Sequence, residues 1–170
     1  MWVPMRLAVL ALAFAVAGCG GIPFLVPDTR TAADHARQVE AKCTGFGEEA
    51  AAPLLSPAIV DSVDAAYSYV QSGPVDREAR LRGARIHVKP QPGFSREMLA
   101  RNLECHESRV VLRRAAAQAD DPYVLPDEWL DIDVDSEGDG FVVLVRADDV
   151  EVARRVLERA QRFAASRPSP

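Results

Sequence analysis

The stretch Ala84-Arg85-Ile86-His87-Val88-Lys89 decides the fold, because apolar and polar residues alternate along its whole length. A period of two is typical of a half-buried strand, and it puts Ile86 and Val88 together on one face. Pro90 follows and lacks the backbone N–H that a strand needs, so the strand ends there. The main folding unit of the chain therefore begins with a β-strand.

A helix is expected directly after this strand, from Ser95 to about Ala117. Pro92-Gly93 turns the chain, and Ser95 is a residue type that caps helices well. Glu97 stands in the first turn, where the positive end of the helix dipole favours a carboxylate. These signals together indicate where the helix begins.

A hairpin and a last helix complete the pattern. Residues Trp129 to Asp135 alternate, Ser136 to Gly140 contain glycine as a turn does, and Phe141 to Val145 are apolar, which indicates two paired strands. Asp148 and Glu151 have the spacing of a capping box, which predicts the start of the last helix.

Residues 84–165 therefore have the order strand, helix, strand, strand, helix. This order predicts an α+β fold, a β-α-β-β-α two-layer sandwich in which two helices cover one face of a three-stranded sheet. The module is similar to an incomplete ferredoxin-like fold. Residues 166–170 are expected to form a tail.

Two N-terminal helices are expected in residues 31–73, packed outside this sandwich. The first begins at Thr31, in a near capping box, and ends before Gly45. The second begins at Ser56-Pro57, and its apolar residues recur at helical spacing up to Gly73. Loops are expected between these elements, at residues 44–55 and 72–83.

Residues 1–18 have the three parts of an export signal. Arg6 supplies the positive charge, Leu7 to Ala17 form an apolar run, and small residues precede Cys19. The apolar run is about eleven residues long, whereas a membrane-spanning helix needs roughly 20. The run is therefore expected to act as a signal peptide and not as a transmembrane anchor.

The segment Val16-Ala17-Gly18-Cys19 resembles the lipobox of bacterial lipoproteins. The resemblance implies that the signal is cleaved before Cys19, that the thiol is diacylated and that the new amino terminus receives an acyl chain such as palmitate. Residues 19–30 would then tether the domain to the membrane. Gly20 stands where an aspartate would resemble an inner-membrane retention signal, so the periplasmic face of the outer membrane is the expected location.

The charge balance argues against nucleic acid as a partner. The chain has 20 basic and 25 acidic residues, a net charge of -5, and removal of Arg6 with the signal makes it -6. The sequence has no basic stripe of the kind that follows a phosphate backbone. The expected partners are the membrane, through the lipid anchor, and another envelope protein.

A disulfide between Cys43 and Cys105 is predicted from the cysteine count. The chain has three cysteines, and lipid on Cys19 leaves an even pair in a compartment that is kept oxidising. The bond would close a loop of roughly 60 residues and stabilise the fold by about 4 kcal/mol in the chain-entropy model.

Residues 55–163 resemble a group of small exported bacterial proteins of unknown function. The resemblance implies one module and no activity. Other members carry a further cysteine in the loop before the second strand, where this chain has Asp120 to Asp127, and this difference leaves the partner of Cys105 open. The resemblance is carried by Leu55-Ser56-Pro57, Gly83-Ala84-Arg85, Pro92-Gly93, Cys105-His106, Glu137-Gly138-Asp139-Gly140-Phe141 and Arg146-Ala147-Asp148-Asp149.

His106 is the main candidate for a metal ligand. It falls on the apolar face of its expected helix, near Met98, so a copper or zinc site could combine it with Met98 or Cys105. The alternative is a core histidine that is hydrogen-bonded to a backbone carbonyl, with Cys105 in the disulfide. We favour the core histidine, because no spacing around His106 resembles an established metal motif.

Other constellations favour structural interpretations. Asp131, Asp133 and Asp135 resemble the start of a calcium loop, but the glycine and the bidentate glutamate of that motif are missing, so they fit the solvent face of a strand. No serine has the setting of a catalytic nucleophile. The serines considered are Ser95, Ser108 and Ser136.

The sequence therefore predicts a lipid-anchored envelope protein that is not an enzyme and needs no cofactor. It would act by binding or by helping an envelope assembly. The alternative function is a periplasmic metal-binding or metal-handling protein that uses His106.

Overall fold

The computed structural model describes residues 29–71, 73 and 76–167 of the chain. The predicted signal peptide, the lipidation site Cys19 and most of the predicted tether lie outside the described residues.

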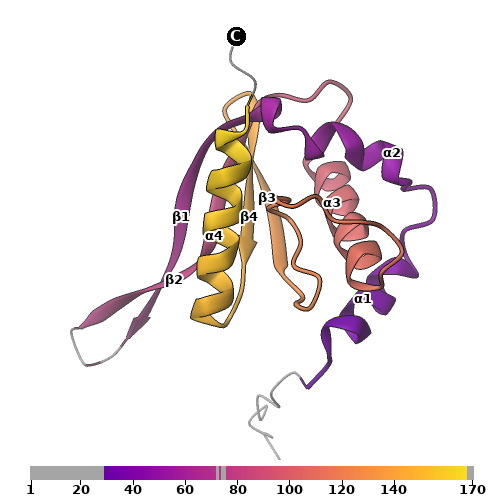
Figure 1. Ribbon diagram of the computed structural model, residues 1–170. Helices are drawn as coiled ribbons and strands as arrows, with labels where there is room; N and C mark the ends of the chain where they lie inside the picture. The colour runs from indigo at the N-terminus through magenta and orange to yellow at the C-terminus, as the bar shows by residue number, and fades with distance from the viewer. Residues whose placement is uncertain (1–28, 72, 74–75, 168–170) are drawn as a thin grey trace, which may run out of the picture.

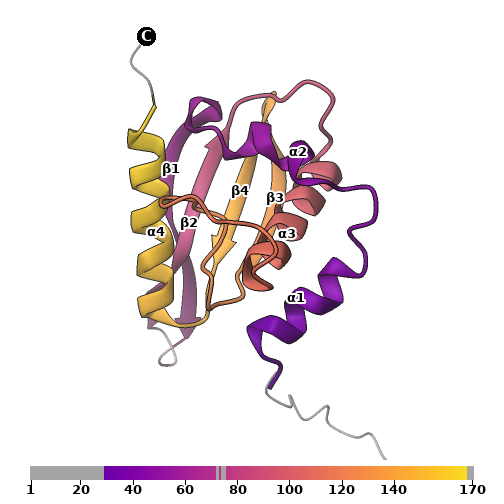
Figure 2. The same cartoon turned by 45° about the vertical axis from the view of Figure 1, so that its right-hand side comes forward.

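A four-stranded antiparallel sheet forms one layer of the fold, with the strand order β1-β2-β4-β3. Two long helices cover one face of this sheet (Figures 1 and 2). The predicted α+β class is confirmed, and the sheet has one strand more than expected. The elements are β1 (Val60–Gln71), β2 (Arg77–Val88), α3 (Arg96–Val111), β3 (Asp131–Glu137), β4 (Gly140–Arg146) and α4 (Val150–Ala165).

The core lies between the sheet and the two helices. Alternating residues of the strands, such as Ile86 and Val143, are buried against Leu103 of α3 and Val156 of α4. Because successive side chains of a strand point to opposite faces, the polar residues between them lie on the other face of the sheet. The amphipathic strands and helices thus bury their apolar sides together.

Each of the two long helices is capped at its N-terminus by the side chain of one residue. Ser95 caps α3 as predicted, and its hydroxyl accepts the backbone N–H of Met98 at 3.2 Å. The cap of α4 is Asp149, which accepts from the N–H groups of Glu151 and Val152. The predicted capping box of Asp148 is therefore wrong by one residue. Asp148 instead forms an ion pair with Arg82.

Helix α3 is shorter than predicted. It ends at Val111 and not near Ala117, because the backbone of Arg113 has a φ of 58° and cannot continue a right-handed helix.

The second predicted N-terminal helix is wrong. Pro57–Ile59 form one 3-10 turn (η2), and the chain then enters β1, which pairs with most of the predicted linker 72–83. Apolar residues from Val60 to Val70 fit a helical period, but backbone pairing with β2 prevails over that local pattern. Residues 31–73 are thus not a helical segment.

Helix α1 (Ala32–Glu40) is present where the first helix is predicted. Thr31 and Asp34 form the expected capping box, with Asp34 N–H donating to the Thr31 hydroxyl at 3.2 Å. The helix ends at Glu40, earlier than expected. A short helix, α2 (Glu48–Ala51), and a 3-10 turn, η1 (Ala52–Leu55), occupy the predicted loop 44–55.

The β1-β2 hairpin extends beyond the rest of the sheet. Strand β4 pairs only with Gly83 to Val88 of β2, so the outer part of the hairpin stands away from the body (Figure 1). We call residues 67–71 and 77–81 the arm. Gly83 stands at its base with a φ of 141°, where any Cβ would overlap the carbonyl oxygen of Val145. Glycine therefore permits the close approach of β2 and β4 at this point.

Candidate functional site

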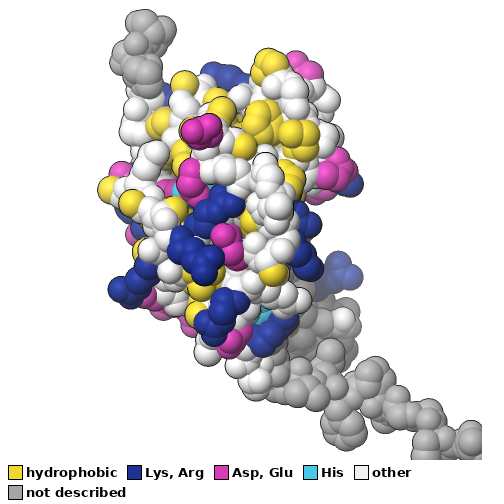
Figure 3. All heavy atoms as spheres, turned by 90° about the vertical axis from the view of Figure 1, so that its right-hand side faces the viewer, with side chains coloured by type: hydrophobic (Ala, Val, Ile, Leu, Met, Phe, Trp, Pro, Cys, Tyr) yellow, Lys and Arg dark blue, Asp and Glu magenta, His cyan; other side chains and the backbone are white. Residues whose placement is uncertain are grey.

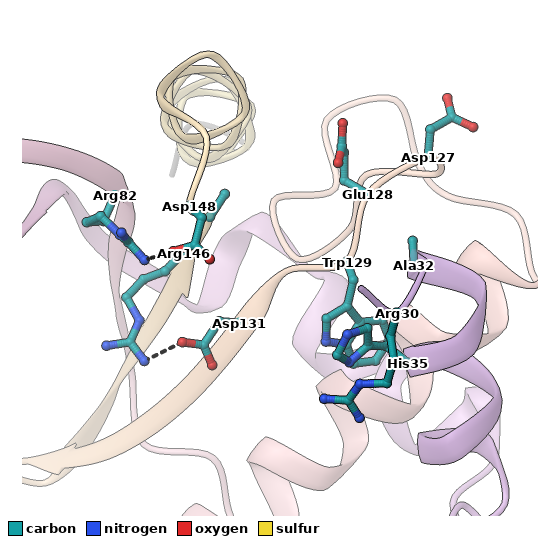
Figure 4. Close-up of a pocket in the computed structure, with 11 residues that line it drawn as sticks. Arg30, Ala32, His35, Arg82, Asp127, Glu128, Trp129, Asp131, Arg146 and Asp148 are labelled. Atoms are coloured by element: carbon teal, nitrogen blue, oxygen red, sulfur yellow. Dashed lines mark hydrogen bonds and ion pairs between the residues drawn. The ribbon is translucent and has the colours of Figure 1, made fainter. Parts of the chain in front are cut away.

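A hollow of about 380 Å³ lies where four separate segments meet. Arg30 just before α1 and His35 in it line one side, the loop before β3 supplies Trp129, the middle of β2 supplies Arg82, and the end of β4 supplies Arg146. Figure 4 shows these side chains around the hollow. The complete lining is Arg30, Ala32, His35, Arg82, Asp127, Glu128, Trp129, Asp131, Arg146, Ala147 and Asp148.

One wall of the hollow is aromatic. The rings of His35 and Trp129 are stacked, with centroids 5.7 Å apart and planes inclined by 14°. In Figure 4 the two rings lie over each other at the side of the hollow that α1 forms. The stack fixes the position of Trp129, and the indole offers a flat apolar surface to a planar group.

The opposite wall is charged. Arg146 Nη2 lies 2.7 Å from Asp131 Oδ2 and also contacts Asp133. Arg82 pairs with Asp148, and the two guanidinium groups lie next to each other in Figure 4. The Nε atom of Arg146 is buried and has no hydrogen-bond partner among the described residues. The wall therefore presents positive and negative groups side by side.

This arrangement is suited to holding a ligand. Guanidinium groups bind carboxylates in a fixed planar geometry, and the neighbouring carboxylates accept from cationic groups. The lining residues supply no hydroxyl and no thiol. Recognition of a polar ligand with charges of both signs is the chemistry that these side chains support.

His106 lies in α3, with 1% of its side chain exposed, and carboxylates contact both ring nitrogens. Nε2 lies 2.7 Å from Oδ2 of Asp121, which is equally buried, and Nδ1 lies 3.2 Å from Oε2 of Glu48. Burial lowers the pKa of His106, but the hydrogen bonds and charges of Asp121 and Glu48 raise it more. The net pKa lies above the ordinary histidine value, so the site favours the imidazolium.

The predicted backbone carbonyl partner of His106 is therefore wrong, although its place in the core is correct. The two carboxylates lie at opposite ring nitrogens, so one metal ion could not bind His106 together with both of them. Cys105 is in a disulfide, and Met98 is 44% exposed. Among the described residues no group of three or more His, Cys, Asp or Glu is placed to hold a metal ion.

The disulfide joins Cys43, just after α1, to Cys105 in α3, with a Cα–Cα distance of 5.7 Å. Polar contacts reinforce this junction. Glu48 contacts Arg109 at 3.3 Å as well as His106, and Ser108 donates to Glu40 at 3.0 Å. Together these contacts fasten the N-terminal segment to α3, and we call them the clamp.

The arginines of α3 and of the turn after it divide between the clamp and the surface. Arg109 and Arg114 lie 3.6 and 3.5 Å from the carboxylate of Glu40, and exposed Arg113 lies 3.9 Å from Asp127. Figure 3 shows Lys and Arg side chains gathered in the middle of one face of the molecule, with Asp and Glu among them. The mixture of signs is that of a solvated face.

The remaining candidates have structural roles. Asp131, Asp133 and Asp135 are exposed along β3, and each lies near an arginine, with Asp135 3.9 Å from Arg96. Ser95 caps α3, and Ser108 belongs to the clamp. These contacts explain the positions of the aspartates and serines. Neither a calcium site nor a catalytic nucleophile is needed to explain them.

Sequence reasoning missed the buried carboxyl of Glu107. Its Oε1 accepts the backbone N–H of Leu130 at 2.6 Å, and Oε2 has no partner among the described residues. Burial raises the pKa of Glu107 well above its usual range, and negative neighbours such as Glu104 and Asp121 add to the effect. Burial therefore favours the neutral form of Glu107, which links α3 to the residue just before β3.

Comparisons of the chain with family models, with curated proteins and with solved structures find no match. Among the described residues, no helix is both long enough and apolar enough to cross a bilayer.

Proposed function

We propose that this protein is a lipid-anchored binding module of the cell envelope, on the periplasmic face of the outer membrane, and that it is not an enzyme. The lipobox-like segment before Cys19 supports the anchor and the location. The hollow at Trp129 supports binding. The observation that carries the proposal is that the His35–Trp129 stack faces the ion pairs of Arg82 and Arg146 across one hollow.

The proposed ligand is a short peptide with charges of both signs and a planar side chain. Small-molecule sites have volumes of roughly 300 to 1,000 Å³, and the hollow falls at the lower end of that range. A ligand carboxylate would bind Arg82 or Arg146, and a ligand ammonium would bind Asp131 or its neighbours. The planar group would pack on the indole of Trp129.

Fluorescence of Trp129 tests this proposal directly. The chain has two tryptophans, and Trp2 lies in the proposed signal peptide, so Trp129 is the one tryptophan of the processed protein. We expect saturable changes in its emission with the peptide Lys-Tyr-Glu and smaller changes with Lys-Ala-Glu. Ser-Tyr-Ser with blocked ends is the uncharged control, and it should not bind.

Two variants separate binding in the hollow from binding elsewhere. Arg146→Gln should weaken binding of Lys-Tyr-Glu by roughly 10- to 150-fold, because a charge-assisted hydrogen bond contributes about 1.5 to 3 kcal/mol. Arg101→Gln is the matched control, since Arg101 pairs with Glu104 on α3 and does not line the hollow. Equal losses in both variants, or no saturable response to any peptide, would contradict the proposal.

The metal-handling function remains the alternative, with His106 as ligand. The carboxylates at both ring nitrogens and the oxidised state of Cys105 argue for the clamp instead. The dependence of the melting temperature on added zinc or copper decides between them.

We also propose that residues 84–165 are a ferredoxin-like module whose fourth strand is supplied by β1. The strand order supports this proposal, because β4 lies between β2 and β3 and β1 pairs on the other side of β2. The group of small exported bacterial proteins that the sequence resembles remains the proposed set of relatives.

A further inference from the structure

We propose that the β1 edge of the arm pairs with the same edge of a second copy of this chain. The strand order places β1 at one edge of the sheet, so the backbone groups that point away from β2 have no sheet partner among the described residues. Arg167 covers only the start of this edge, where its Nη1 donates to the carbonyls of Val60 and Asp61. From Ser62 onward, this outer edge of β1 accepts no such hydrogen bond from the described residues.

From Ala65 to Gln71 this edge lacks the features that normally prevent strand pairing. Natural edges carry charges, prolines or bulges that keep other strands away. Residues 65–71, Ala-Ala-Tyr-Ser-Tyr-Val-Gln, contain neither a charge nor a proline. The register shift after Ala66 leaves the extra residue, Arg82, on β2, and the extra residue on β1 is Asp61 near its start, so β1 is continuous from Ser62 onward. This edge is therefore available for a further strand.

Apolar side chains are exposed along the same edge. Tyr67 is 58% exposed, Tyr69 is 72% exposed and Val70 is 48% exposed. Together with Met98 they are the large hydrophobic residues that the described part of the chain leaves exposed. Residues 67–71 of β1 thus combine exposed backbone groups with exposed aromatic rings.

A second copy fits this edge because the edge is uncharged and can pair with itself. Two identical strands that pair in antiparallel fashion are related by a two-fold axis. With the axis at Ser68, Tyr67 of one copy lies opposite Tyr69 of the other, and Ala66 lies opposite Val70. Cross-strand aromatic pairs stabilise antiparallel strands, and no like charges meet in this register.

The proposed dimer is weak in solution. A pairing of seven residues from each copy buries less area than the roughly 1,200 Å² of a standard stable interface. If the proposed lipid anchor holds two copies in one membrane, the local concentration rises and pairing becomes favourable. That step rests on the proposed function, but pairing through the arm does not.

Cysteine crosslinking of the full chain in detergent micelles tests the register. In Ser68→Cys the two new thiols face each other across the axis, whereas Ser62→Cys puts the same change at a position that has no counterpart in this register. We expect Ser68→Cys to form a disulfide-linked dimer at least about tenfold faster than Ser62→Cys, because paired thiols have a high effective concentration. Equal rates would overturn the proposal.

A charge swap provides an independent test by light scattering over a range of concentrations. Tyr67→Lys with Tyr69→Lys puts like charges opposite each other and should leave only monomer. Tyr67→Glu with Tyr69→Lys puts opposite charges there and should retain the dimer. The arm proposal fails if both variants are monomers while the wild type dimerises, or if the wild type is a monomer at every concentration. Loss of peptide binding in Arg146→Gln is a separate readout, so either proposal can fail alone.

Discussion

His106 Nε2 lies 2.7 Å from Asp121 Oδ2, and each of these side chains is 1% exposed. A buried ion pair of this kind makes the stability of the fold depend on pH. Because Asp121 and Glu48 raise the pKa of His106 above its unfolded value near 6.5, the stabilisation is fully present below about pH 6.5. It is lost as the pH rises through the folded pKa.

The substitution His106→Gln tests this pH dependence. At pH 6 it should lower the free energy of unfolding by about 1 to 3 kcal/mol, because a buried charged hydrogen bond is lost. The difference from the wild type should shrink as the pH rises toward 9. Urea unfolding at several pH values measures this. A constant difference across the range would contradict the ion pair.

The same variant decides the metal alternative. The clamp predicts that added zinc or copper leaves the melting temperature of the wild type unchanged. A ligand role for His106 predicts a rise that follows mass action and disappears in His106→Gln. That second result would replace the proposed binding function with metal handling.

The Cys43–Cys105 bond should contribute about 4 kcal/mol, since it closes a loop with a sequence separation of 62 residues. Replacing both cysteines with Ala should lower the free energy of unfolding by this order. The reducing agent dithiothreitol should destabilise the wild type and leave the double variant unaffected. Two free thiols in protein recovered from the periplasm would show that the bond does not form in the cell.

Glu107→Gln should keep or raise stability at neutral pH. Gln preserves an oxygen acceptor for the N–H of Leu130 and removes a carboxyl whose ionisation burial disfavours. Because the folded pKa is raised, the wild type loses stability as the pH rises through it, and the variant should not. Glu107→Leu should cost about 1 to 3 kcal/mol, because the buried N–H of Leu130 loses its acceptor. Thermal unfolding of both variants between pH 5 and 9 measures these effects.

Cys19→Ala should abolish acylation, because the proposed thioether forms on that sulfur. Metabolic labelling with an alkyne-bearing fatty acid, followed by gel analysis, checks this. Cys43→Ala is the control and should retain the label. Label that persists in Cys19→Ala would refute the anchor.

The elements that could be predicted from the sequence are those whose structure depends on residues close together in the chain. The strand at Ile86 and the cap at Ser95 depend on residues close in sequence, and both predictions are confirmed. Strand β1 was missed, because Val60, Val63 and Val70 fit a helical period as well. Its partner β2 decides the structure, and a period within one segment cannot show that pairing.

The candidate site was missed for a related reason. His35, Trp129 and Arg146 come from three segments that the fold brings together, and each residue alone has no motif. The same holds for the carboxylate partners of His106, since Glu48 and Asp121 lie 58 and 15 residues away in sequence. Sequence placed His106 in the core, but only the fold supplies its partners.

The position of Arg30 at the rim of the hollow limits where a captured peptide can be held. Ten residues lie between Cys19 and Arg30, which makes eleven steps along the chain. A fully extended chain covers at most 3.3 to 3.6 Å per step, so this segment is no longer than roughly 40 Å. With the proposed lipid on Cys19, the rim of the hollow could not move farther than that from the bilayer surface. The hollow would therefore stay within roughly 40 Å of the membrane surface. Peptides deeper in the periplasm would have to diffuse to the membrane before they could bind.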